Sequence, residues 1–237
     1  MRAMILAAGR GQRMRPLTDT TPKPLLEVDG KPLIVWHIER LVAAGLRDII
    51  INHAWLGGQI EQALGAGAAF GARIRYSPEA PGGLETAGGI VQALPFFEDQ
   101  PFLVVNGDIW CDWNPSAAVH LASQMEARRA LAWLLLVDNP PQHPEGDFVL
   151  GPDAWVADRG TPGTGTALTF AGIGVYQPAL FAGLRAGISA PLAPLLRQAM
   201  TARQVFGTRH TGAWEDVGTP ERLAGLNHFL RSGSRYT

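Results

Sequence analysis

Short apolar runs alternate with amphipathic segments throughout the first 137 residues, and this alternation limits the fold more than any other feature of the sequence. The runs predict buried strands over residues 3–6, 48–51, 73–77, 102–106 and 130–137. Apolar residues at helical spacing predict intervening helices over residues 33–44, 59–64, 86–94 and 116–126. Strands that alternate with helices in this way pair in parallel and are covered by helices on both faces.

The second half of the chain is less regular. Residues 138–165 are rich in proline, glycine and aspartate, which indicates a hairpin and loops. Strands are expected over residues 168–176 and 205–210, and helices over residues 193–203 and 220–231. We therefore expect an α/β fold with a Rossmann-like, mostly parallel sheet sandwiched by helices. A single domain should cover residues 1–237, with a regular half over about 1–115 and a smaller mixed half over about 116–237.

Composition and charge exclude several classes of protein. With 46% hydrophobic residues and a formal net charge of −1, the chain resembles neither a disordered protein, a nucleic-acid coat nor a protein of anionic membrane surfaces. The single cysteine, Cys111, excludes an intrachain disulfide framework and a cysteine-rich zinc site. We recognise neither a signal peptide nor an apolar stretch of about 20 residues. A cytoplasmic protein without nucleic-acid or membrane partners is expected.

A loop rich in glycine and arginine follows the first predicted strand. It reads Leu6-Ala7-Ala8-Gly9-Arg10-Gly11-Gln12-Arg13, and Lys23 follows between two prolines. Glycines let a backbone approach a ligand and direct N–H groups at phosphate, while arginines add charge-assisted contacts. Residues 1–23 carry five basic side chains against one acidic side chain, a local charge of +4. This loop therefore indicates a small anionic ligand.

Two other phosphate-binding loops fit the sequence less well. The dinucleotide fingerprint requires a third glycine where this chain has Met14. The kinase-type loop requires Gly-Lys followed by serine or threonine, which the chain lacks. A nicotinamide-dependent oxidoreductase is therefore disfavoured.

Polar residues also follow the strand predicted over residues 102–106. Asn106 and Asp108 flank a glycine there, at the same carboxyl edge of the sheet as the first loop, where α/β folds bind ligands. A carboxylate in this position suits Mg²⁺, which takes few carboxylates together with phosphate oxygens of a substrate. An aspartate at a strand end is more often a turn residue, so Asp108 alone does not establish a metal site.

The first loop resembles the signature of the sugar-phosphate nucleotidyltransferases, the NDP-sugar pyrophosphorylases. That signature reads Leu-Ala-Ala-Gly-x-Gly-Thr-Arg-Leu-x-Pro-Leu-Thr, followed by Lys-Pro, and the chain departs from it at Gln12 and Met14. The resemblance extends over nearly the whole chain. It implies an enzyme that joins a nucleoside monophosphate to a sugar 1-phosphate and releases pyrophosphate. The nucleotide would be bound by the half over about 1–115 and the sugar phosphate by the half over about 116–237.

The short length and the run Asn52-His53-Ala54-Trp55-Leu56 narrow the resemblance to bacterial uridylyltransferases of N-acetylmuramate α-1-phosphate. This implies UMP transfer from UTP in peptidoglycan recycling. A mannose 1-phosphate guanylyltransferase, a cytidylyltransferase for a small phosphorylated alcohol and a catalytically silent nucleotide-sugar-binding regulatory subunit stay open. The regulatory subunit is disfavoured because the residues that the family uses in catalysis are present. The oligomeric state is not indicated.

The resemblance assigns the nucleotide side residue by residue. Contacts to the nucleotide are implied for Leu6, Ala7, Ala8, Gly9, Gly11, Gln12, Arg13, Glu79, Gly83, Thr86 and Asn106. Glu79 falls where relatives contact the base, and its carboxylate can accept N3–H of uracil or N1–H of guanine. Asp216, in a segment that resembles the family's closing Asp-Val-Gly-Thr-Pro, joins Asp108 as the Mg²⁺ pair. The implied catalytic residues are Arg13, Lys23 and Asp108.

The sugar-phosphate side is less marked. Gly146 and Gly172 resemble positions that line the sugar, and Lys23 is implied to contact a phosphate of one of the substrates. Many relatives carry a further lysine that holds the sugar phosphate, but this chain has no lysine after Lys31. We expect Arg159 to take its place. Nothing in the sequence indicates what would bind the lactyl carboxylate of N-acetylmuramate.

Overall fold

The chain forms two compact units, each built from segments that are not contiguous in the sequence. The structure is a computed structural model and describes residues 1–161 and 163–232. The first unit contains residues 2–84, 105–116 and the chain from 212 onward; the second contains residues 85–104 and 117–211. These units do not coincide with the two halves expected on either side of about residue 115, since each unit takes a segment from the opposite half.

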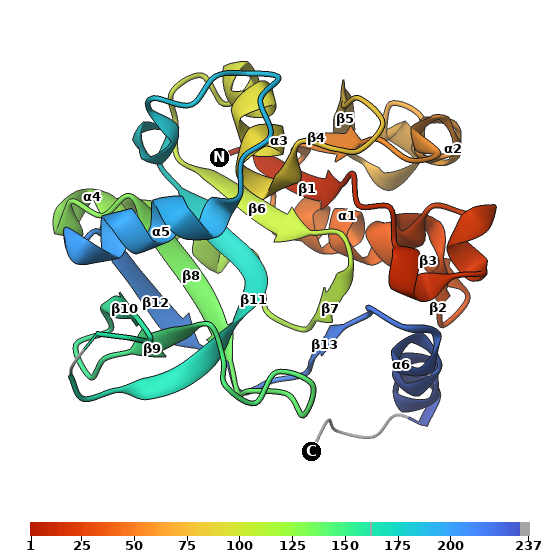
Figure 1. The fold of residues 1–237 in the computed structure, drawn as a ribbon. Helices are drawn as coiled ribbons and strands as arrows, with labels where there is room; N and C mark the ends of the chain where they lie inside the picture. The colour runs from red at the N-terminus through yellow and green to blue at the C-terminus, as the bar shows by residue number, and fades with distance from the viewer. Residues whose placement is uncertain (162, 233–237) are drawn as a thin grey trace. The chain divides into compact units, whose positions relative to one another are not determined.

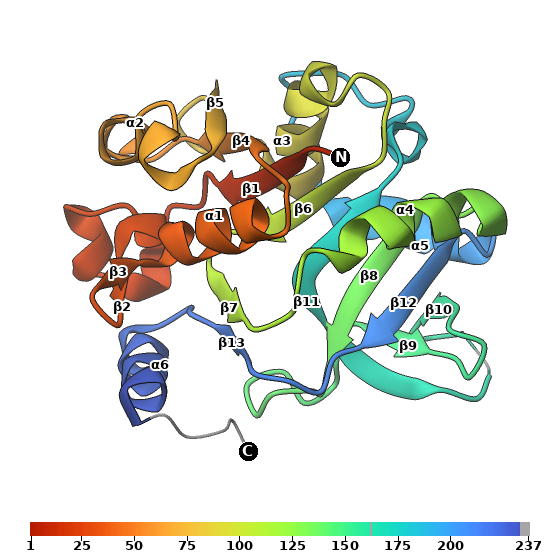
Figure 2. The same cartoon turned by 180° about the vertical axis from the view of Figure 1, so that it is seen from behind.

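A parallel sheet forms the centre of the first unit (Figure 1). Its strands, in spatial order, are β1 (Ala3–Ala7), β4 (Asp48–His53) and β5 (Arg73–Pro78). The connections contain α1 (Leu33–Ala43) and α2 (Gly57–Leu64). The apolar face of α1 is buried and the helix lies along β1 (Figure 2). The helix stops at Gly45, whose φ of +82° is one that glycine adopts readily.

Two short antiparallel ribbons and a closing helix complete the first unit. The ribbons pair β2 (Glu27–Val28) with β3 (Lys31–Pro32), and β7 (Ile109–Cys111) with β13 (Trp214–Asp216). The closing helix is α6 (Pro220–Ser232). A cluster that includes Met14, Leu33, Trp110, Val217 and Leu226 is buried among these elements. Segments far apart in the sequence are thereby held by one hydrophobic core, in which each buried side chain contributes about 1.5–3 kcal/mol.

The second unit contains a mixed sheet. Its strands are β8 (Ala132–Val137), β9 (Phe148–Leu150), β10 (Val156–Asp158), β11 (Thr166–Tyr176) and β12 (Val205–Arg209). Its helices are α3 (Glu85–Ala93), α4 (Ala117–Arg128) and α5 (Leu192–Thr201). β12 is parallel to β8, whereas the β8–β11, β11–β9 and β9–β10 pairs are antiparallel. Helix α5 lies in front of β8 and β12 in Figure 1 and α4 in front of them in Figure 2, so the two helices cover opposite faces.

The α/β class expected from the sequence is confirmed, with parallel pairing of β1, β4 and β5 in the first unit and mixed pairing in the sheet of the second. β6 (Phe102–Asn106) has the predicted bounds and runs from the second unit into the first. The hairpin expected within residues 138–165 is formed by β9 and β10; Pro162 lies outside the described residues. The pairing of β7 with β13 was not expected. None of the described helices is both long and apolar enough to span a bilayer.

Two adjacent glycines at the start of α2 should respond differently to alanine. A Cβ on Gly57 would overlap the imidazole of His53, whereas a Cβ on Gly58 would meet nothing within 4 Å. His53 is buried and its Nε2 lies 2.7 Å from Glu61, so the ring has little freedom to move. We expect Gly57→Ala to lower the free energy of unfolding by about 1–3 kcal/mol and Gly58→Ala to leave it unchanged or raise it by up to about 1 kcal/mol. Urea denaturation measures both, and equal effects would contradict this packing.

Candidate functional site

The loop after β1 folds tightly onto itself. Gly11 has φ +65°, and its carbonyl accepts the Thr18 hydroxyl at 2.7 Å. A Cβ on Gly11 would lie 3.0 Å from the methyl group of Thr18 and 3.3 Å from Cβ of Lys23. Glycine at this position therefore lets the loop close against Lys23. The chain continues through the 3-10 turns η1 (Gln12–Met14), η2 (Leu17–Asp19) and η3 (Lys23–Leu25).

The three arginines of this loop are held differently. The Arg10 guanidinium lies 3.7 Å from the centre of the Trp55 ring. Arg15 donates to the Asp19 carboxylate at 2.7 Å, and this hydrogen bond holds the pKa of Asp19 below its ordinary value. Arg13 is exposed and, over residues 1–161 and 163–232, makes no hydrogen bond or ion pair. Arg10 and Arg15 thus stabilise the loop, whereas Arg13 is available to a ligand.

Lys23 and Asp108 form an ion pair at the carboxyl edge of the parallel sheet. Lys23 Nζ lies 2.8 Å from Asp108 Oδ2; the lysine side chain is 8% exposed and the aspartate 42% exposed. An ammonium group this deeply buried requires a partner, since an unpaired buried charge is strongly destabilising. The two residues meet because the N–H of Gly107 donates to the Leu6 carbonyl at 2.8 Å. A Cβ on Gly107 would lie 2.6 Å from that carbonyl oxygen, so glycine permits the approach.

Asp216 lies beside Asp108 because β7 pairs with β13. The register sets Asp216 opposite Ile109, and the N–H of Val217 donates to the Asp108 carbonyl at 2.9 Å. The two aspartates therefore occupy neighbouring backbone positions, although 107 residues separate them in the sequence. Asp216 Oδ2 accepts a hydrogen bond from Arg222 Nη1 at 2.6 Å.

These two carboxylates fit a divalent metal ion. Carboxylate oxygens are the hard ligands that Mg²⁺ prefers, and such sites need few of them when substrate phosphates complete the coordination. Each carboxylate carries a cationic partner, Lys23 on Asp108 and Arg222 on Asp216, so both positions already stabilise positive charge. The structure brings the predicted metal pair together.

Glu79 is held by hydrogen bonds from two sides. Its Oε1 accepts from Asn52 Nδ2 at 2.6 Å, and its Oε2 accepts from the N–H of Leu84 at 2.7 Å. Asn52 is buried, and its Oδ1 accepts the N–H of Ala7 at 2.9 Å. The ends of β1, β4 and β5 are thus joined by one chain of hydrogen bonds. Gly83, with φ +74°, lies next to the Glu79 carboxylate.

At the start of α3, two backbone N–H groups share one acceptor. The N–H groups of Ala87 and Gly88 both donate to the carbonyl of Ala190, at 2.9 and 3.1 Å. They are therefore already satisfied within the second unit. Thr86 lies beside them and is half-buried. Glu85 has φ +56°, a backbone conformation that favours glycine.

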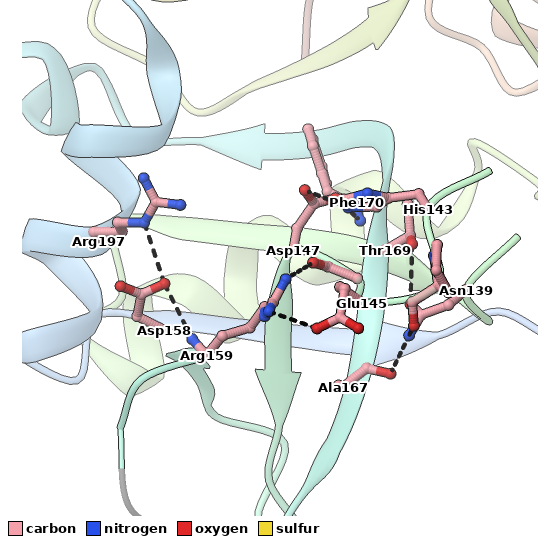
Figure 3. A network of polar contacts seen from close by, with 12 residues as sticks. Asn139, His143, Glu145, Asp147, Asp158, Arg159, Ala167, Thr169, Phe170 and Arg197 are labelled. Carbon is pink, nitrogen blue, oxygen red and sulfur yellow. Dashed lines mark hydrogen bonds and ion pairs between the residues drawn. The ribbon is translucent and has the colours of Figure 1, made fainter. Parts of the chain in front are cut away.

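Arg159 belongs to a polar network in the second unit (Figure 3). Its Nη1 donates to the Gly146 carbonyl at 3.0 Å, and its Nη2 lies 2.9 Å from Glu145 Oε2. Gly146 has φ +66°, and a Cβ there would lie 2.5 Å from Asn139 Oδ1. The structure thus brings Arg159 and Gly146 together. Gly172, with φ +77°, lies in β11, where the pairing with β8 shifts register.

Two buried groups, His37 of α1 and Cys111 of β7, do not change charge near neutral pH. Burial, reinforced by the positive charge of Arg40, lowers the pKa of His37 to about 4. Burial raises the pKa of the Cys111 thiol to about 12. His37 is therefore a neutral imidazole and Cys111 a protonated thiol at pH 7, and neither acts as a base or nucleophile there.

Comparison with known proteins identifies the family. A model of the nucleotidyl transferase family matches residues 2–146. The chain belongs to the nucleotidyl transferase family. Nucleotidyltransferases of this family generally use divalent metal ions, which agrees with the paired carboxylates of Asp108 and Asp216.

Sequence relatives of this nucleotidyltransferase cover nearly its whole length. It is 59% identical to an N-acetylmuramate α-1-phosphate uridylyltransferase of Neisseria meningitidis over 94% of this chain and 95% of the relative. A Caulobacter vibrioides protein with the same name is 35% identical over 92% of each chain. The β catalytic subunit of mannose-1-phosphate guanylyltransferase from Danio rerio is 29% identical over 98% of this chain and 65% of that protein.

Solved structures share the fold at lower identity. A structure described as a glucose-1-phosphate thymidylyltransferase, from Bacillus anthracis, superposes with a TM-score of 0.83 over 100% of this chain and 98% of that chain, at 21% identity. HddC from Yersinia pseudotuberculosis superposes with a TM-score of 0.74 over 97% and 99%, at 19% identity. The nucleotidyltransferase fold expected from the sequence is confirmed.

Two residues at the site were not assigned from the sequence. Asn52 ends a run of three isoleucines, and a polar residue that closes an apolar strand at the ligand-binding edge was a usable signal. Arg222 lies in the first turn of the closing helix, where the helix dipole disfavours a cation. A cation in this unfavourable position indicates a nearby acidic partner, and this could have been predicted from the sequence.

Proposed function

We propose that this nucleotidyltransferase transfers UMP from UTP to N-acetylmuramate α-1-phosphate, giving the UDP-sugar and pyrophosphate. The observation that carries the proposal is the Lys23–Asp108 ion pair, which lies beside Asp216 and next to the glycine loop. The chain is also 59% identical to a relative named N-acetylmuramate α-1-phosphate uridylyltransferase. Mg²⁺ is the proposed metal ion, and peptidoglycan recycling in the cytoplasm is the proposed setting.

The reaction requires no covalent intermediate with the protein. An oxygen of the acceptor phosphate attacks the α-phosphorus of UTP in line, a new P–O bond forms, and the bond from that phosphorus to the bridging oxygen breaks. Catalysis then consists of positioning the substrates and stabilising negative charge. When bound to Asp108 and Asp216, the metal ion would supply a Lewis-acid charge to phosphate oxygens. Lys23 would bind the α-phosphate or acceptor phosphate, and Arg13 the β- and γ-phosphates.

Glu79 supports uracil or guanine rather than cytosine. Its carboxylate is an acceptor-only group, and Asn52 and the Leu84 N–H fix both oxygens in place. A carboxylate oxygen has a second lone pair that can accept N3–H of uracil or N1–H of guanine. Cytosine presents a lone pair at N3 in place of that N–H, and a carboxylate can accept only from its N4 amino group. The backbone of the β1 loop, Gly83, Thr86 and Asn106 would complete the nucleotide contacts.

The acceptor contacts are proposed for Gly146, Arg159 and Gly172. In the structure, Arg159 is paired with Glu145, which is 72% exposed. An ion pair this exposed is worth little, so a phosphate dianion can displace the carboxylate. Arg159 would then bind the sugar phosphate in place of the family's lysine.

Pyrophosphate release from the four nucleoside triphosphates, each with a panel of sugar 1-phosphates, tests the proposal. We expect turnover only with UTP, with N-acetylmuramate α-1-phosphate the preferred acceptor, and dependence on Mg²⁺. Preference for GTP with mannose 1-phosphate would identify a guanylyltransferase instead. Binding of UDP-sugar without pyrophosphate release in any combination would identify a regulatory protein.

Arg159→Ala should weaken binding of the acceptor sugar 1-phosphate without affecting binding of UTP. We expect the KM for the sugar 1-phosphate to rise about tenfold, with the KM for UTP unchanged, because one charge-assisted contact to phosphate is lost. Arg197→Ala in the same network is the matched control, since Arg197 contacts Asp158 rather than Gly146. Initial rates at varied acceptor concentration measure the effect, and an unchanged acceptor KM removes Arg159 from the site.

A further inference from the structure

Two arginines converge on Gly218, which follows Val217 and lies two residues before the first residue of the closing helix. A Cβ on Gly218 would overlap Nη2 of Arg222 and would lie 3.2 Å from Nη2 of Arg13. Both guanidinium groups therefore lie over the same small area of backbone. Gly218 is buried, and the absence of a side chain there leaves room for both groups. Two like charges this close repel each other unless an anion is shared between them.

Arg222 is also in an unfavourable place on its own helix. It lies in the first turn of α6, where the positive end of the helix dipole stabilises acidic rather than basic side chains. Its side chain is 17% exposed and its Nη1 lies 2.6 Å from Asp216 Oδ2. The Asp216 carboxylate thus stabilises Arg222 in this unfavourable position. The same carboxylate is one of the two proposed metal ligands.

We propose that Arg222 and Arg13 form a two-arginine clamp for pyrophosphate, and that a metal ion on Asp216 releases Arg222 to close it. The inference rests on the proposed function in one respect, namely that pyrophosphate is the leaving group. A guanidinium presents a planar pair of donors that matches two phosphate oxygens, and a pyrophosphate offers oxygens on two phosphorus atoms. Each arginine then takes one phosphate over Gly218.

The coupling follows from competition for one carboxylate. Before the metal ion arrives, Arg222 neutralises Asp216. A divalent ion on Asp216 supplies that positive charge itself, and the Arg222 guanidinium needs a new anion. Pyrophosphate is such an anion, so metal and pyrophosphate bind cooperatively. Removal of Arg222 should therefore weaken pyrophosphate binding while leaving Asp216 freer to bind the metal.

Titration calorimetry with inorganic pyrophosphate in the presence of Mg²⁺ tests the clamp, with the full chain and no nucleotide or sugar phosphate. We expect Arg222→Gln to bind pyrophosphate about tenfold or more weakly than the parent protein, and Arg222→Lys to lie between them. Mn²⁺ binding without phosphate, followed by electron paramagnetic resonance, should be unchanged or tighter in Arg222→Gln. A merely structural arginine would instead weaken both.

Arg231→Ala is the matched control, because Arg231 lies on the same helix and contacts exposed Asp29 at 3.6 Å. It should change neither measurement. Pyrophosphate affinity within twofold of the parent in Arg222→Gln, or equal losses of Mn²⁺ and pyrophosphate affinity, would overturn the clamp. Because no nucleotide or acceptor is present, a wrong assignment of UTP or of the sugar leaves this result intact. Conversely, if the clamp is wrong, the results expected from the pyrophosphate-release assays with the four nucleoside triphosphates do not change.

Discussion

Asp108→Ala is expected to lower kcat/KM by at least about 100-fold. The carboxylate is one of two proposed metal ligands, and loss of charge stabilisation on reacting phosphates costs about 3 kcal/mol or more. The effect should fall mainly on kcat, since this contact strengthens as negative charge spreads in the transition state. Steady-state rates at saturating Mg²⁺ measure it. Near-normal turnover would remove Asp108 from the catalytic machinery.

The same substitution also strips the buried Lys23 ammonium of its partner, so folding and catalysis must be separated. Lys23 is only 7% exposed, and Asp108→Ala should lower the free energy of unfolding as well. Asp108→Asn keeps an oxygen that can accept from Lys23 but removes the negative charge that a metal ion requires. We expect Asp108→Asn to be more stable than Asp108→Ala and equally inactive. A stable and active Asn variant would mean that Asp108 serves Lys23 rather than a metal ion.

Lys23→Ala is expected to lower kcat/KM by a similar factor, at least about 100-fold. Its ammonium group is the proposed contact to the α-phosphate or acceptor phosphate, in a buried setting where charge interactions are strong. When Lys23 is removed, the unpaired Asp108 carboxylate costs less free energy than an unpaired Lys23 would, because its side chain is 42% exposed and water can solvate it. The stability of Lys23→Ala should therefore fall less than that of Asp108→Ala.

The chain's second lysine provides a matched control for this prediction. Lys31 lies 2.5 Å from Glu39 at the surface and has no proposed role in the reaction. Lys31→Ala should keep normal rates and stability within about 0.5 kcal/mol. Pyrophosphate-release assays on both variants measure the contrast. If Lys23→Ala retains near-normal turnover, Lys23 is only a structural partner of Asp108.

The parts of the fold that local pattern determines could be predicted from the sequence. The β6 strand has the predicted bounds because five consecutive residues, four of them buried, end at a glycine. Anion binding by the loop after β1 could be predicted because its glycines and arginines, and the spacing between them, are typical of phosphate binding. β7 and β13 were missed because each has three residues, too few for a periodic signal, and each is stabilised by a partner far away in the sequence.

Long-range partnerships account for most of what the sequence did not indicate at the site. The local charge of the first loop suggested that several arginines face a ligand, yet Arg15 is paired with Asp19 and Arg10 stacks on Trp55. The role of Asn52 depends on Glu79, 27 residues later, and that of Arg222 on the fold of β13. Arg15 and Asp19 are only four residues apart, but the partners of Arg10 and Asn52 are distant in the sequence and are brought close only by the fold.

Because the segments of the two units alternate along the sequence, the second unit is fully synthesised at the ribosome before the first. The first unit receives its last strand, Asp216 and α6 only after the whole second unit has emerged. Until then, Met14, Leu33 and Trp110 lack the Val217 and Leu226 side chains that bury them. The glycine loop of the nascent chain therefore keeps this apolar surface uncovered until residues 212–232 have been synthesised. The second unit, whose last segment ends at residue 211, can fold earlier, whereas the first becomes competent for catalysis only after β13 and α6 have been synthesised.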